Sequence, residues 1–156
     1  MEAHLELSFQ PMWPNVRKIR QQVGATLEAC PQGLRSAAVM TASELVENAI
    51  KYGESVPAAP SVTFLLEASP LQLAIRVING STNALGVAEL QRRVKDLSEA
   101  ANKEALYLAR LEQLLAHSED SGKLGIYRIG FEGGFDLALD YTNDVVTMTA
   151  TRNADG

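Results

Sequence analysis

Apolar residues recur along the chain at two different spacings, one typical of strands and one typical of helices. Alternation of apolar and polar residues, or a short apolar run bounded by turn residues, predicts strands. These strands are expected at 4–9, 62–66, 71–78, 135–141 and 145–151. Apolar residues spaced three or four apart predict helices at 14–29, 34–52 and 124–131. A charged stretch with a narrow apolar stripe, 87–117, is expected to be one long helix or two helices separated at Asn102.

The order of these elements predicts the fold class. Strand, helix, helix, strand, strand, helix, short helix, strand, strand is typical of an α/β two-layer sandwich. We expect a mixed, mostly antiparallel sheet with helices packed on one face. Residues 1–152 are expected to form one domain with a helical insertion at about 86–117, and residues 153–156 a frayed tail.

Composition and charge remove several classes of function. The chain has 156 residues, of which 46% are hydrophobic and 21% charged, which is ordinary for a globular protein. A formal net charge of -5 without a basic block argues against nucleic-acid binding. The single cysteine, Cys30, excludes an intramolecular disulfide and a zinc cluster. No apolar run would span a membrane, and residues 1–10 do not resemble a signal peptide, so a cytoplasmic location is expected.

The candidate functional residues lie in the last turns of the helix expected at 34–52, within residues 41–53. Glu44, Asn48 and Lys51 share one stripe of this helix, opposite an apolar stripe. A carboxylate one turn from a carboxamide suits a hydrated Mg²⁺ ion, which prefers oxygen ligands and shares substrate phosphates. A Glu there could also accept a proton. The alternative is a solvated helix face ended by a Gly53 cap, and spacing alone favours that alternative.

Residues 44–53 nevertheless resemble a specific motif. Their sequence, ELVENAIKYG, resembles the N box, E-L-x-x-N-A-x-K-[HY]-G, of the GHKL (Bergerat-fold) ATP-binding family, which includes gyrase-type ATPases, histidine kinases and bacterial anti-sigma-factor kinases. The resemblance implies that Asn48 holds the Mg²⁺ that bridges the nucleotide phosphates and that Glu44 is the catalytic base or water-orienting group. It places Lys51 near the phosphates or the adenine.

A second, weaker match lies at the end of the strand expected at 71–78. The family reads adenine with D-x-G-x-G, and Asn79 and Gly80 stand at the corresponding place here. The amide of Asn79 could accept from the adenine amino group and donate to a ring nitrogen. It lacks the charge-assisted strength of a carboxylate.

A third match is partial and lies before the helix expected at 124–131. The family's phosphate loop reads G-x-G-L-G-L, and here Gly122, Lys123, Leu124 and Gly125 keep only the Leu-Gly end. Amides at a helix N-terminus suit phosphate. Lys123, where glycine is usual, either adds a charge for the γ-phosphate or blocks close approach of the backbone.

The resemblance implies a function and leaves alternatives. The nearest group is the stand-alone serine/threonine kinases of the anti-sigma-factor type, which would use Mg²⁺ and ATP to phosphorylate a small partner resembling an anti-sigma-factor antagonist. A degenerate module that sequesters a partner without nucleotide is the alternative, with the helices at 87–117 as its surface. A plain ATPase is less favoured because no domain is present to use hydrolysis. A homodimer is compatible with the resemblance.

Overall fold

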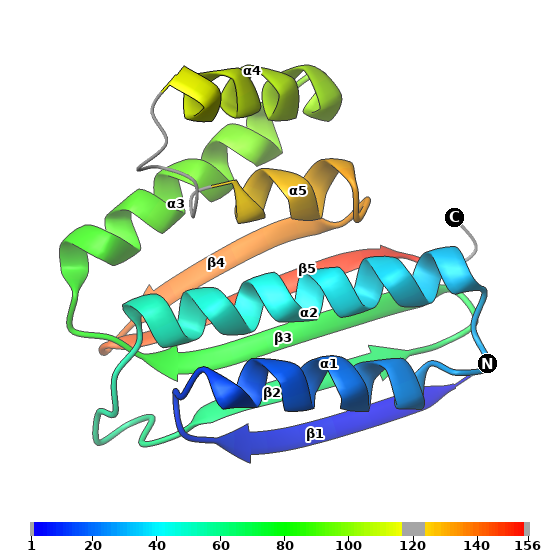
Figure 1. Cartoon of the computed structure of the whole chain (residues 1–156). Coiled ribbons are helices and arrows are strands. Elements are labelled where there is room, and N and C mark those ends of the chain that lie inside the picture. Colours follow the sequence, from blue (N-terminus) through cyan, green and yellow to red (C-terminus); the bar gives the residue numbers. More distant parts are fainter. Residues whose placement is uncertain (1, 117–123, 155–156) are drawn as a thin grey trace.

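The computed structural model describes residues 2–116 and 124–154, and its elements follow the predicted order (Figure 1). The strands and helices are β1 (Ala3–Phe9), α1 (Pro14–Thr26), α2 (Gln32–Tyr52), β2 (Val62–Ala68), β3 (Gln72–Gly80), α3 (Ala84–Glu99), α4 (Lys103–Ala116), α5 (Gly125–Phe131), β4 (Asp136–Thr142) and β5 (Val145–Asn153). Each predicted strand and helix is therefore present, with ends that differ by a few residues.

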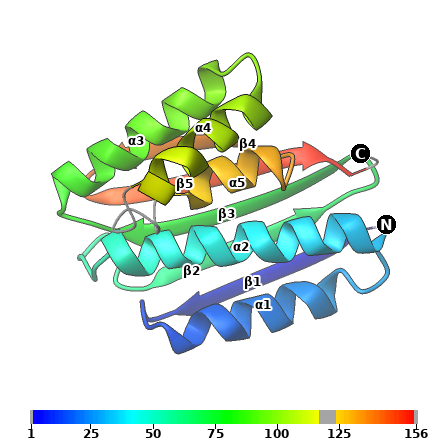
Figure 2. The same cartoon turned by 45° about the horizontal axis from the view of Figure 1, so that its top comes forward.

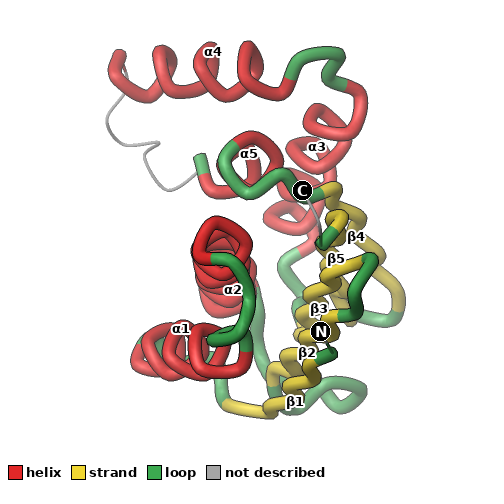
Figure 3. Tube along the Cα trace, turned by 90° about the vertical axis from the view of Figure 1, so that its right-hand side faces the viewer, coloured by secondary structure: helices red, strands yellow, loops and turns green. Residues whose placement is uncertain are grey.

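One sheet carries all of these strands in the order β1-β2-β3-β5-β4. Every neighbouring pair is antiparallel, so the expected mostly antiparallel sheet is confirmed. Figure 3 shows the sheet edge-on, with α1, α2 and α5 on one side of it. Helix α3 packs against α5 and β4, and α4 lies outermost, over α5 (Figures 2 and 3).

Alternation along the strands places the core between the sheet and the helices. In β2, Phe64 and Leu66 are fully buried, whereas Leu65 between them is only half-buried. Successive side chains of a strand point to opposite faces, so Leu65 lies on the face without helices. It pairs there with Arg76 of β3, which in turn pairs with Thr149 of β5. One face is thus apolar and covered, and the other is mixed and uncovered.

Helix α2 lies along the middle of the covered face and ends at Gly53. The backbone of Gly53 is extended, with φ -93° and ψ 160°, so this residue is not the left-handed cap that a terminal glycine suggests. A Cβ at Gly53 would overlap the carbonyl oxygen of Ala49 and lie 2.7 Å from Nδ2 of Asn79. Glycine is needed here because a side chain would meet both the last turn of α2 and Asn79 at the end of β3.

Replacing Gly53 by alanine should therefore destabilise the fold. We expect Gly53→Ala to lower the free energy of unfolding by about 1–3 kcal/mol, the usual effect of overpacking. Gly33 is a matched control in the first turn of α2, because a Cβ there would meet nothing within 4 Å. Gly33→Ala should be neutral or slightly stabilising. Urea unfolding followed by circular dichroism measures both, and equal effects would contradict the close approach.

The charged stretch at 87–117 was expected to form either one long helix or two helices. It forms two, α3 and α4. The break lies at 100–102, and Oδ1 of Asn102 accepts a hydrogen bond from the Ala105 amide at 3.0 Å, which starts α4. Helix α3 buries Val87, Leu90 and Leu97, whereas α4 has no fully buried residue. Within the described parts of the chain, none of the helices has the length and apolar character needed to cross a bilayer.

Candidate functional site

Glu44 and Asn48 lie one turn apart on α2, and neither side chain points freely into solvent. The side chain of Glu44 is 20% exposed, and Asn48 is half-buried. The amide nitrogen Nδ2 of Asn48 is buried and has no hydrogen-bond partner. Buried polar groups in native proteins nearly always have a partner, and for this amide nitrogen, as for Oγ1 of Thr41 on the same helix, the described residues supply none.

The carboxylate of Glu44 is held by the first turn of α5. Its Oε2 lies against Gly125, so closely that any Cβ at Gly125 would overlap it. Its Oε1 lies 3.4 Å from Nη1 of Arg128. Burial, followed by the charge of Glu47, raises the pKa of Glu44 above its ordinary value, while Arg128 acts in the opposite direction. A partly buried carboxylate with a raised pKa is the kind of group that serves as a general base.

Asn79 and Gly80 are the last residues of β3, and Asn79 lies beside Gly53, just after the end of α2. Asn79 is 5% exposed, and its Nδ2 donates to the carbonyl of Gly80 at 3.0 Å and lies beside Gly53. The carbonyl of Gly80 also accepts from the Glu54 amide at 2.8 Å. Tyr52, the last residue of α2, is eight residues from Glu44, which corresponds to about 12 Å of helix. The expected adenine and phosphate ends of the site are thus ordered along one helix.

The link between β3 and α3 is fixed to α2 by side-chain hydrogen bonds. The Ser81 hydroxyl donates to the carbonyl of Tyr52 at 2.6 Å, and the Tyr141 hydroxyl donates to the carbonyl of Ser81 at 2.7 Å. The carboxylate of Glu54 accepts from the amide and the hydroxyl of Thr82, and these hydrogen bonds lower the pKa of Glu54. These bonds fix the segment after β3 against the end of α2.

The other residues predicted for the site have fewer contacts among the described residues, or lie outside them. Lys51 is exposed, and its Nζ lies 5.3 Å from the centre of the Tyr52 ring. Leu124 immediately precedes α5, and Gly125 is its first residue. Gly122 and Lys123 lie outside the described residues, so their predicted contact with phosphate stays a prediction.

Two arginines near this site were not singled out from the sequence. Arg128 contacts Glu44 although 84 positions separate them. Arg93 of α3 is 3% exposed, and its Nη2 lies 2.6 Å from Oε1 of Glu89. The spacing of Gly125 and Arg128, three apart on the helix expected at 124–131, was the available signal for the first. An arginine on an amphipathic helix gives no such signal.

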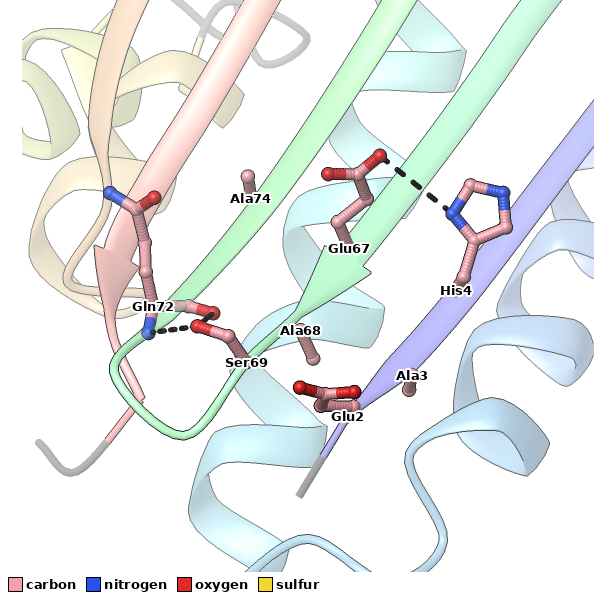
Figure 4. Close-up of a pocket in the computed structure, with 8 residues that line it drawn as sticks. All are labelled: Glu2, Ala3, His4, Glu67, Ala68, Ser69, Gln72 and Ala74. Carbon is pink, nitrogen blue, oxygen red and sulfur yellow. Dashed lines mark hydrogen bonds and ion pairs between the residues drawn. The ribbon is translucent and has the colours of Figure 1, made fainter.

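A separate hollow lies on the uncovered face of the sheet and contains none of the predicted residues (Figure 4). It is at the end of the strands away from Gly80. Nδ1 of His4 lies 3.7 Å from Oε1 of Glu67 there, with both side chains more than half exposed. The Ser69 hydroxyl accepts from the Gln72 amide at 3.1 Å and so belongs to the β2–β3 turn. These contacts are those of a sheet edge and a hairpin.

Comparison with known proteins identifies the fold. No family model matches the chain, and no curated protein matches it in sequence. Among solved structures, it is similar to the crystal structure of the RsbU and RsbW domains of Rv1364c from Mycobacterium tuberculosis, with a TM-score of 0.54 and 14% sequence identity. The match covers 96% of this chain and 32% of that one, so this chain spans about a third of the solved chain. The expected Bergerat-type fold is thereby confirmed.

Proposed function

We propose that this chain binds Mg²⁺-ATP and acts as a serine/threonine protein kinase on a small regulatory partner resembling an anti-sigma-factor antagonist. The observation that carries the proposal is the half-buried pair of Asn48 and Glu44 one turn apart on α2: the unpartnered Nδ2 of Asn48 would donate to a phosphate oxygen, and its amide oxygen would be the Mg²⁺ ligand. The fold shared with a structure of RsbU and RsbW domains supports the choice among ATP-binding families.

The donor set of α2 fits a magnesium nucleotide. Mg²⁺ is usually held by one or two protein oxygens together with waters and substrate phosphates. Asn48 supplies one neutral amide oxygen, so the metal would rely on the nucleotide for most of its charge.

Glu44 would take part in the phosphoryl transfer, whereas Asn79 and Gly80 at the end of β3 would bind the adenine. When bound, Mg²⁺-ATP supplies the γ-phosphoryl group and a cation that offsets the phosphate charge. Glu44 would accept the proton from the partner's hydroxyl as its oxygen forms a bond to the γ-phosphorus and the bond to the ADP oxygen breaks. Asn79 would read adenine beside Gly80, and Lys51, Gly122, Lys123, Leu124 and Gly125 would contribute to holding the nucleotide.

Removing the Asn48 amide tests the nucleotide site. We expect Asn48→Ala to weaken Mg²⁺-ATP binding by at least about tenfold, because an oxygen ligand is lost and the change is worth about 1.4 kcal/mol or more. Isothermal titration calorimetry measures the affinity directly. Asn153→Ala, an exposed asparagine at the end of β5, is the matched control and should bind normally. Absence of heat from the native chain at millimolar Mg²⁺-ATP would overturn the proposal.

The runner-up is a nucleotide-independent binding module. Nδ2 of Asn79 already donates to its own chain, which leaves this amide with less capacity to read adenine. Such a module would bind its partner equally well with and without Mg²⁺-ATP. Transfer of labelled γ-phosphate to a partner hydroxyl distinguishes the kinase from this module and from a plain ATPase, which would release the label as inorganic phosphate.

A further inference from the structure

We infer that the first turn of α5 acts as a clamp that positions the carboxylate of Glu44, and that Arg128 is the positioning residue. Helix α4 in turn fixes the position of α5 through Tyr107 and Arg110. The inference rests on the proposed function only in taking Glu44 as the reacting carboxylate. It assigns a role to the helical insertion, which the resemblance leaves without one.

Both oxygens of the Glu44 carboxylate contact the same face of α5. Gly125 meets Oε2 through its backbone, and Arg128 approaches Oε1 at 3.4 Å. Residues three apart lie on one face of a helix, so a single rigid turn contacts both oxygens. The orientation of the carboxylate is therefore determined by where α5 sits, and a shift of α5 moves both contacts together.

Arg128 is itself held from a second side. Its Nε lies 3.0 Å from Oε2 of Glu132, one turn further along the chain. The other oxygen of Glu132 accepts a hydrogen bond from the Tyr107 hydroxyl at 3.2 Å. Tyr107 belongs to α4, so a continuous series of polar contacts joins α4 to Glu44 through Glu132 and Arg128.

Two ring contacts join α4 to α5 at neighbouring points. The rings of Tyr107 and Phe131 have centroids 5.3 Å apart, and the guanidinium of Arg110 lies 5.4 Å from the centre of the Tyr127 ring. Arg110 also pairs with Asp96 of α3 at 3.2 Å. Helix α4 has no fully buried residue, and it is attached by these contacts together with the partly buried Leu106 and the pair of Lys103 with Asp136. An element attached in this way detaches more readily than a core helix.

The clamp predicts a large effect on turnover and a small effect on stability. The Arg128 side chain is 38% exposed, and pairs this exposed contribute little to folding. A misplaced catalytic group, by contrast, can slow a reaction by up to about a hundredfold. We expect Arg128→Gln to lower kcat about tenfold or more with an unchanged KM for ATP, and Arg128→Lys to recover part of it. Tyr107→Phe, which keeps the ring, should give a smaller loss of the same kind.

A double-mutant cycle separates positioning from general damage. If Arg128 acts through Glu44, adding Arg128→Gln to Glu44→Gln should change the residual rate less than twofold. Additive losses would show that Arg128 acts elsewhere and would overturn the inference. Lys95→Gln, at a 72%-exposed position of α3, is the control and should behave as the native chain.

A readout without nucleotide keeps this inference apart from the kinase proposal. The carboxyl ¹³C resonance of Glu44 in the ligand-free chain, assigned with Glu44→Gln, should shift in Arg128→Gln and shift less in Tyr107→Phe. An unmoved resonance in Arg128→Gln would overturn the clamp even in an active kinase. A shifted resonance in a chain that binds no ATP would support the clamp while the kinase proposal fails.

Discussion

Glu44→Gln should abolish most phosphotransfer while leaving the affinity for Mg²⁺-ATP intact. Positioned general bases typically contribute about 10²–10⁴-fold, so the single-turnover rate of transfer should fall by at least about a hundredfold. Gln keeps the size of the side chain and still offers an oxygen to Arg128, so the surroundings of Asn48 should persist. Glu28→Gln, at an exposed position just after α1, is the control and should retain transfer. An unchanged rate in Glu44→Gln would show that Glu44 is not the base.

The same variant should be more stable than the native chain at neutral pH. Burial raises the pKa of Glu44 in the folded state, so ionising this carboxyl costs more in the folded chain than in the unfolded one. Such a group stabilises the fold below its unfolded pKa, and this contribution is lost as pH rises through the folded pKa. Gln is neutral at every pH, so Tm should rise by about 1–3 °C at pH 7. The difference should shrink as the pH is lowered and Glu44 becomes protonated.

A fall in Tm would give a different account of Glu44. It would mean that the pairing with Arg128 outweighs burial, so that the ionised carboxylate contributes to folding. A gain in stability together with a loss of transfer is the pattern expected of a functional carboxylate held in an unfavourable environment. Differential scanning fluorimetry across pH, run on both chains, decides between the two.

Local patterns were sufficient to predict the architecture. The hairpin of β4 and β5 follows from strict alternation around Asn143 and Asp144, which both take the positive φ values that a tight turn requires. Asn102 is a local signal of the same kind, because a side chain that caps a helix start competes with continued helix. The position of Asn48 beside Glu44 needed only the helical repeat. Each of these features depends on residues close together in sequence.

Contacts between distant elements were not accessible in this way. Helix α5 places Arg128 against Glu44, and α4 lies on α5. Both contacts depend on packing angles between helices, which no single segment of the sequence encodes. Gly53 shows the same limit in part, since its position after α2 indicates a cap, whereas a Cβ there would overlap the Ala49 carbonyl and also crowd Nδ2 of Asn79 on a distant strand. The candidate site is therefore predicted residue by residue along α2 and is incomplete where another helix contributes.

Phe64→Ala should cause the largest loss of stability. Phe64 is fully buried in β2, between β1 and β3 on the side covered by helices. Truncating a buried phenylalanine costs about 3–5 kcal/mol, because apolar contact is lost and a cavity remains. Total stabilities of about 5–15 kcal/mol make this a large fraction, so Tm should fall steeply. Chemical unfolding followed by circular dichroism measures the change in the free energy of unfolding.

The next residue along the strand is a matched control that also tests the uncovered face. Leu65 is half-buried and points away from the helices, so Leu65→Ala should cost only about 1 kcal/mol, less than the full burial of a leucine. A comparable loss in both variants would mean that the uncovered face is buried in solution against another surface. Because a second copy of the chain is one such surface, the Leu65→Ala cost should then depend on protein concentration, whereas the Phe64→Ala cost arises within one chain.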